Sequence, residues 1–164
     1  VLKAQHPEFE TYTAGSTHYP AGVACADCPM TKVTGGGAKY TDHNIKSPLL
    51  DPQLTACSTC HKNTAFVKAR VALIQDQAYT ALINTEEALL AAIAEIKAAA
   101  AVEGADAVLL SQARALQREA QMTWDFVAAE NSMGFHNPEY TLSNLAYAAD
   151  VARQAQVAAL KALP

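Results

Sequence analysis

All four cysteines of this chain lie in a segment that shows no regular periodicity of apolar residues. Residues 1–62 also contain five of the seven prolines, five of the seven glycines and four of the five histidines. A segment of this length without regular secondary structure does not form a compact domain unless something else organises it. Disulfides, metal ions and bound cofactors are the usual organisers. We therefore expect residues 1–62 to need a ligand.

The most informative motif within this segment is Cys57-Ser58-Thr59-Cys60-His61. C-x-x-C-H is the attachment sequence of c-type haem, in which the two thiols form thioethers with the haem vinyl groups. The following histidine then supplies an imidazole nitrogen to the iron. A C-x-x-C pair alone is also compatible with a redox dithiol or with half of a zinc site. We predict that Cys57 and Cys60 hold haem c and that His61 is an axial ligand.

A second motif, Cys25-Ala26-Asp27-Cys28, is followed by Pro29 where a histidine would complete it. Proline has no side-chain donor atom, so this motif cannot ligate iron by itself. Three interpretations stay open: the thiols hold a haem ligated from elsewhere, the two C-x-x-C motifs share a tetrahedral zinc ion, or the pair forms a disulfide. Six-coordinate haem also needs a distal ligand from outside its motif. The candidate histidines outside the motifs are His6, His18, His43 and His136.

Residues 63–164 contain 28 of the 35 alanines and have a helical periodicity. Alanine favours helix but buries little apolar area. Apolar residues recurring at steps of three and four predict helices over about 64–102, 107–132 and 142–162, the first two joined in an antiparallel hairpin. We interpret these helices as a scaffold, and no stretch of the chain predicts a strand. The expected core positions of the first helix are Val67, Val71, Ile74, Ala78, Leu82, Leu89, Ile93 and Ile96.

The charge of the chain excludes some classes of function. Its formal net charge is -4, with 12 Lys+Arg against 16 Asp+Glu, so no basic surface for nucleic acid or for an anionic membrane is expected. The longest apolar stretch, residues 88–102, is interrupted by Glu95 and Lys97, and no transmembrane segment is predicted. The chain begins at Val1 without a signal peptide, which we interpret as the start of a processed protein or of a fragment.

Several motifs occur in the same order as in one enzyme family. They are Lys3-Ala4-Gln5-His6-Pro7-Glu8, the C-x-x-C motif at Cys25, Thr41-Asp42-His43, the C-x-x-C-H motif at Cys57, and His136-Asn137-Pro138-Glu139. This combination resembles the C-terminal part of the ammonia-forming cytochrome c nitrite reductases, the pentahaem cytochrome c552 family. These periplasmic enzymes reduce nitrite to ammonium with six electrons. With the helical pattern, the resemblance implies an all-α fold of the multihaem cytochrome c type, with an irregular haem-binding segment over 1–62 and long helices over 63–164.

The resemblance also implies roles for individual residues. His6 matches the active-site histidine that faces the substrate on the catalytic haem. Lys3, through its backbone carbonyl, and Gln5, through its side chain, match calcium ligands, and oxygen ligands suit that cation. The distal haem ligands that the resemblance implies are His18 for the haem on Cys57 and Cys60, His136 for the haem on Cys25 and Cys28, and His43 for a haem whose attachment motif is absent from this chain.

The chain also departs from the family pattern. It lacks the C-x-x-C-K motif of the catalytic haem, three of the five haem motifs in all, and the arginine and tyrosine of the substrate pocket. We therefore expect one or two haems c per chain and electron transfer, but no nitrite reduction by this chain alone.

The partners that we expect are the N-terminal part of the parent enzyme, a second copy bound through the long helices, and a redox protein that donates electrons. The resemblance implies a periplasmic parent, with calcium as a further cofactor. Two other functions stay open. One is a small electron-carrier cytochrome without catalysis, and the other is a zinc-stapled helical interaction module.

Overall fold

The computed structural model describes residues 4–164, which form two compact units. One unit combines the N-terminal residues up to Ser16 with Ile74–Pro164, and the other is Thr17–Leu73. Lys3, one of the two expected calcium ligands, lies outside the described residues. No helix within residues 4–164 is both long enough and apolar enough to cross a bilayer.

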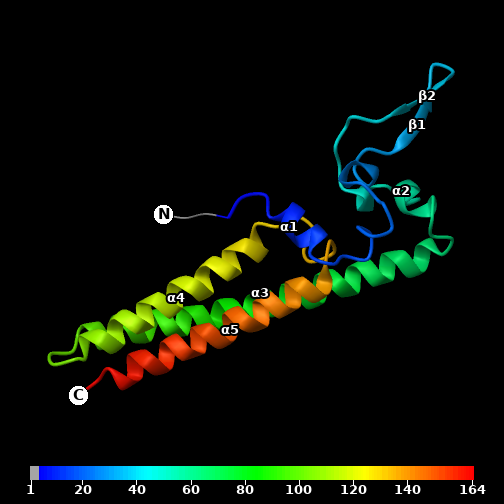
Figure 1. Ribbon diagram of the computed structural model, residues 1–164. Coiled ribbons are helices and arrows are strands. Elements are labelled where there is room, and N and C mark those ends of the chain that lie inside the picture. The colour runs from blue at the N-terminus through cyan, green and yellow to red at the C-terminus, as the bar shows by residue number, and fades with distance from the viewer. Residues whose placement is uncertain (1–3) are drawn as a thin grey trace. The chain divides into compact units, whose positions relative to one another are not determined.

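Three long helices dominate the chain (Figure 1): α3 (Thr64–Ala100), α4 (Ala107–Ala128) and α5 (Pro138–Lys161). The sequence places the start of the third helix at 142, but α5 begins at Pro138. Asn137 is the reason, because its side chain accepts a hydrogen bond from the Tyr140 N–H at 3.1 Å and so caps the helix. Proline is tolerated at the first helical position because the N–H that it lacks would have no hydrogen-bond acceptor within the helix.

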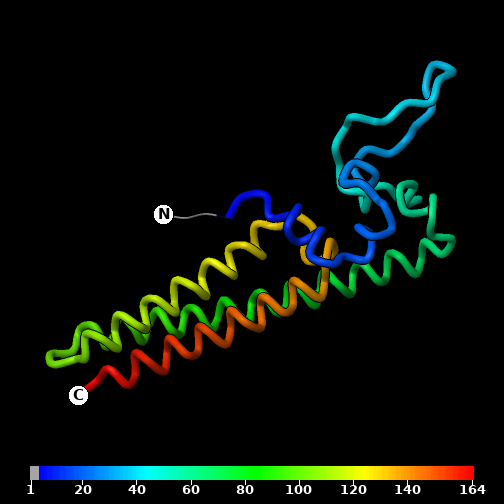
Figure 2. The backbone as a smooth tube through the Cα atoms, viewed as in Figure 1, coloured from blue at the N-terminus to red at the C-terminus, as the bar shows by residue number. Residues whose placement is uncertain are grey.

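The long helices of the first unit lie side by side (Figure 2), and mainly small residues are buried between them. One cluster joins Ile96 of α3 to Leu110 of α4 and to alanines of α5. A second cluster joins Leu89 of α3 to Ala120 of α4, with Trp124 packed against it. From the first cluster to the second, the contacts move from Ile96 back to Leu89 on α3 and from Leu110 forward to Ala120 on α4. The two helices therefore run antiparallel, which confirms the expected hairpin.

The expected core face of α3 is wrong at one position. Ile93 is 41% exposed, whereas Leu89 and Ile96 are buried. Ile93 lies on the same broad face as Leu89 and Ile96 but at its edge, because the buried centre of the seam runs through Thr85, Leu89, Ala92 and Ile96. The remaining expected positions are buried or half-buried.

The second unit contains a hairpin that the sequence analysis does not predict. Strands β1 (Lys32–Gly35) and β2 (Ala38–Thr41) pair antiparallel, with Gly35 opposite Ala38. The turn residues Gly36 and Gly37 have φ of 59° and 80°, which suits a two-residue hairpin turn. The strands are short and largely exposed, so they lack the apolar alternation on which strand prediction depends.

Four short helical segments complete the described structure. They are α1 (Glu8–Thr13) in the first unit, and the 3₁₀ turns η1 (Cys25–Asp27) and η2 (Pro48–Leu50) and helix α2 (Thr55–Ser58) in the second. The two C-x-x-C motifs begin within η1 and α2, so each is placed by a short helical turn.

Candidate haem-binding site

The C-x-x-C-H motif forms a single helical turn that begins within α2. The Cys57 carbonyl accepts hydrogen bonds from the His61 N–H at 2.8 Å and from the Cys60 N–H at 3.2 Å. Residues three and four apart on a helix lie on the same face. The turn therefore directs both thiols and the imidazole of the motif to one side, as attachment of a planar macrocycle and ligation of its metal require.

The loop before α2 fixes where this turn begins. Asp51 accepts hydrogen bonds from the Thr55 N–H at 2.8 Å and from the Gln53 N–H at 3.0 Å. Hydrogen bonds from Thr55 and then from Gln53 hold the pKa of Asp51 below its ordinary value. Leu54, between them, has φ of 50° and is fully buried. The Lys68 ammonium, on α3, donates to the Pro52 carbonyl at 2.9 Å, so the loop is also tied to the following helix.

His18 and His61, which the family resemblance pairs on one iron, lie close together in the second unit. Their ring centroids are 6.2 Å apart and their planes are inclined at 80°. Two imidazoles on opposite sides of one metal ion have ring centroids about 6.3 Å apart, because each metal–nitrogen bond is about 2.0 Å long and each nitrogen lies about 1.15 Å from its ring centroid. The spacing of His18 and His61 thus matches that of two imidazoles on one metal ion, and it is also the spacing of an edge-to-face ring contact.

The second motif differs from the first in its backbone as well as in its missing ligand. Asp27 caps its turn, since its carboxylate accepts the Ala24 N–H at 2.8 Å. Pro29 occupies the position of His61 and has no N–H, so the hydrogen bond that His61 donates to Cys57 has no equivalent. The Met30 N–H donates instead to the Ala26 carbonyl at 3.0 Å.

The state of the thiols decides among the other interpretations of the motifs. All four cysteines are free, so Cys25 and Cys28 do not form a disulfide. Burial first, and then the neighbouring Cys57, raises the pKa of Cys28, and burial raises that of Cys57. Redox-active dithiols have lowered thiol pKa values, so a redox role is disfavoured. Within residues 4–164, which include every cysteine, no group of three or more His, Cys, Asp or Glu could hold a metal ion. The structure therefore gives no support to a shared zinc site.

His136 lies in the first unit, in the loop between α4 and α5. Its Nδ1 is 2.5 Å from Oε1 of Glu130, and its backbone N–H donates to Ser132 Oγ at 2.8 Å. Burial opposes ionisation of Glu130, but hydrogen bonds from His136 and Ser132 outweigh it and lower the pKa of the carboxyl group. The expected ligation of a haem on Cys25 and Cys28 by His136 involves both units and stays a prediction.

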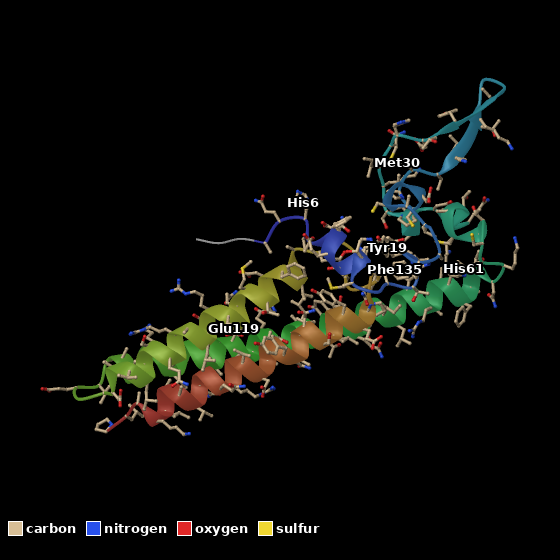
Figure 3. The ribbon with its side chains drawn as sticks, viewed as in Figure 1. His6, Tyr19, Met30, His61, Glu119 and Phe135 are labelled. Atoms are coloured by element: carbon tan, nitrogen blue, oxygen red, sulfur yellow. The ribbon has the colours of Figure 1, made fainter. Side chains whose placement is uncertain are left out.

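The remaining candidate residues are exposed. His6 has its side chain 94% exposed, with Nδ1 3.9 Å from Glu8 Oε2 (Figure 3). Its φ of 52° is uncommon for a residue with a side chain, and such strain is frequent at active sites. Gln5, the expected calcium ligand within the described residues, is exposed. His43 is also exposed and follows Asp42, whose carboxylate accepts the Asn44 N–H at 3.0 Å.

Sequence reasoning missed Glu130. A single glutamate at the end of a helical pattern looks like an exposed terminal residue, and its role depends on a loop that folds back on it. The available signal was its position six residues before a candidate ligand, in a break rich in turn-forming residues. That spacing alone does not place a carboxylate against an imidazole.

Comparison with known proteins identifies the family. The family model for cytochrome c552 matches residues 1–164. Cytochrome c nitrite reductase subunit NrfA of Nitratidesulfovibrio vulgaris is 38% identical over 99% of this chain, and cytochrome c-552 of Aliarcobacter butzleri is 39% identical over 99% of it. The chain spans 32% of the length of each of these two relatives.

A solved structure is similar in fold as well as in sequence. The catalytic subunit, NrfA, of the cytochrome c nitrite reductase from Desulfovibrio desulfuricans ATCC 27774 superposes with a TM-score of 0.92 at 37% identity. The match covers 99% of this chain and 35% of that subunit, which has two calcium sites. Motifs, fold and relatives agree, and the chain therefore belongs to the cytochrome c552 family.

Proposed function

We propose that this chain is the haem-binding and electron-transferring C-terminal segment of a periplasmic, ammonia-forming nitrite reductase. The observation that carries the proposal is the turn from Cys57 to His61 with His18 at 6.2 Å from His61 between ring centroids. The family match over the whole chain supports it. The relatives are about three times as long, so nitrite reduction to ammonium is proposed for a longer protein and not for these residues alone.

In this proposal Cys57 and Cys60 form the thioether links, and His61 and His18 are the axial ligands. Haem c, when bound, supplies one-electron redox chemistry. Because His61 and His18 would both ligate the iron, this haem would not offer a place for a substrate and would suit electron transfer. The bonds of Asp51 and Lys68 to the preceding loop hold the turn in place.

We propose a second haem on Cys25 and Cys28, with His136 as its ligand. The motif supplies the two thiols, but Pro29 supplies no donor atom. A haem held in this way has an axial position that the motif itself does not fill. The site would therefore differ from the first in spin state and in reduction potential, and the number of haems per chain, one or two, depends on it.

The other site residues serve the parent enzyme in this proposal. His6 positions and protonates nitrite and its reduction intermediates, Lys3 and Gln5 bind calcium, and His43 ligates a haem attached elsewhere in the parent. The N-terminal part of the parent supplies the catalytic haem, and a redox partner supplies electrons. We also propose a homodimer through the long helices, whose exposed apolar side chains support it. These include Leu73, Leu90, Ile93, Val157 and Leu160, each at least 41% exposed.

Purification after expression with haem maturation tests the proposal. Each covalently bound haem adds about 616 Da to the intact mass, and we expect one or two additions together with a Soret band that survives acid–acetone extraction. A Cys57→Ser/Cys60→Ser variant should lose one addition. A colourless protein with the mass of the unmodified chain would contradict the proposal.

A further inference from the structure

The loop between α4 and α5 contains a buried carboxylate that accepts several hydrogen bonds. The side chain of Glu130 is 2% exposed. Its Oε1 accepts the Ser132 N–H at 3.0 Å, and its Oε2 accepts the Ser132 hydroxyl at 2.8 Å and the Gly134 N–H at 3.3 Å. Both oxygens thus accept hydrogen bonds from the loop, which is the pattern of an ionised carboxylate. Burial of such a charge is tolerated only where it is hydrogen-bonded.

This carboxylate determines which nitrogen of His136 bears the proton. Nδ1 of the ring is 2.5 Å from Glu130 Oε1. Since the carboxylate only accepts, Nδ1 must donate. In the neutral ring Nε2 then has a free lone pair. The His136 side chain is 32% exposed, so the ring is only partly enclosed by the loop.

Further contacts restrict the position of the ring. The His136 N–H donates to Ser132 Oγ at 2.8 Å, and Tyr12 of α1 meets the imidazole edge to face with ring centroids 6.0 Å apart. The next residue, Asn137, donates to the buried Thr11 carbonyl at 3.1 Å. Gly134 has φ of 81°, and a Cβ there would lie 2.9 Å from the Ala78 Cβ. The loop is therefore held on both sides, by α1 and by α3.

We propose that Glu130 is a positioning residue that holds His136 as the Nδ1-protonated imidazole, with Nε2 available to haem iron, and that it makes this ligand more basic. The first half of the proposal concerns the ring itself, and the second half rests on the proposed function. A histidine ligand commonly donates its other N–H to a carboxylate, which fixes the tautomer and raises the basicity of the ligand. A more basic ligand stabilises ferric over ferrous iron and lowers the reduction potential.

The tautomer is tested on a ring without iron, because iron bound at Nε2 would itself keep the proton on Nδ1. A long-range 1H–15N correlation spectrum identifies the protonated nitrogen of each histidine, and it is recorded on the reduced full chain with Cys25→Ser and Cys28→Ser, in which no haem is attached beside His136. A His136→Gln variant assigns the His136 signals. We expect a single tautomer with the proton on Nδ1, and we expect Glu130→Ala to lose this preference. A wild-type ring protonated at Nε2, or an even mixture of tautomers, would overturn the proposal.

The effect on the haem is tested by a potentiometric titration of the loaded chain. Glu130→Gln keeps the size of the side chain but removes its charge. We expect the preference of the His136-ligated iron for the ferric state to fall about tenfold, a rise of about 59 mV for a one-electron couple. The haem of His18 and His61 should keep its potential and serves as the internal reference. Unchanged potentials in a chain that binds haem would overturn the tuning role and leave the proposed function intact.

Two control variants separate positioning from a structural role. Glu119→Gln makes the same chemical change on α4, at an exposed side chain whose hydrogen-bond donor is Tyr147. We expect it to change neither potential nor tautomer. Ser132→Ala removes two hydrogen bonds of the loop but leaves the contact between Glu130 and Nδ1. If Ser132→Ala shifts the potential as much as Glu130→Gln does, Glu130 acts only by stabilising the loop, and the proposal fails.

Discussion

Replacing His18 by alanine should open one coordination position and leave the chain otherwise intact. In the proposed site His18 and His61, whose ring centroids are 6.2 Å apart, would ligate the same iron ion. Loss of the His18 imidazole would therefore leave that iron with one ligand fewer and open to an added ligand. His18 is only half-buried, so its truncation removes little packing. The expected magnitude is stoichiometric: one additional equivalent of carbon monoxide bound per chain in the reduced state.

The assay is a carbon monoxide titration of the reduced protein, followed in the Soret band, with the low-spin signal of the oxidised protein measured in parallel. Imidazole added to the His18→Ala variant should occupy the open position and restore the low-spin signal. His43→Ala is the matched control, because His43 is exposed and belongs to neither motif. The same carbon monoxide stoichiometry in wild type and His18→Ala would refute the pairing of His18 with His61 on one iron.

Three further variants test other parts of the structure. Pro29→His supplies the missing ligand, so the low-spin fraction should rise and carbon monoxide binding should fall; unchanged spectra would contradict a haem on Cys25 and Cys28. Leu145→Ala, at a side chain that is 1% exposed, should lower the free energy of unfolding by about 2–5 kcal/mol in urea, and a loss below 1 kcal/mol would mean that the seam closes over the gap. Because the folded-state pKa of Asp51 is lowered, its ionised form stabilises the fold above the unfolded pKa, and this contribution is lost as the pH falls through the lowered value. Asp51→Asn should thus be less stable than wild type at neutral pH, and the difference should vanish in urea titrations at low pH; a difference independent of pH would contradict this.

The sequence predicts the helical part of the fold well, because amphipathic periodicity and caps are local properties. Asn63 illustrates this, since its side chain accepts the Phe66 N–H at 3.0 Å at the start of α3. The β-hairpin escaped prediction because its stability comes from turn geometry and backbone pairing and not from an apolar face. Its Gly36-Gly37 turn was nevertheless visible in the sequence. The start of α5 was misplaced because Asn137 was not recognised as a cap.

The residues of the candidate site also differ in whether local sequence patterns could predict them. The turn from Cys57 to His61 is a local motif, so the sequence predicts its residues directly. The proximity of His18 to His61 was expected from resemblance alone, because no pattern in the intervening residues reports a distance. Neither the local motifs nor the family resemblance predicted a role for Glu130. Its contact with His136 exists only because Met133, with φ of 51°, and Gly134 turn the chain back on itself.

The alanine seams between the long helices limit how this protein can change. Ala92, Ala113, Ala120, Ala152 and Ala159 are fully buried. A larger side chain there would force the helices apart, at about 1–3 kcal/mol, whereas glycine would cost about 1 kcal/mol in helix propensity. Substitution is thus penalised in both directions at positions that perform no chemistry. Over evolutionary time, we expect these positions to accept replacements about as rarely as the haem ligands, and the polar outer faces of the same helices to diverge freely.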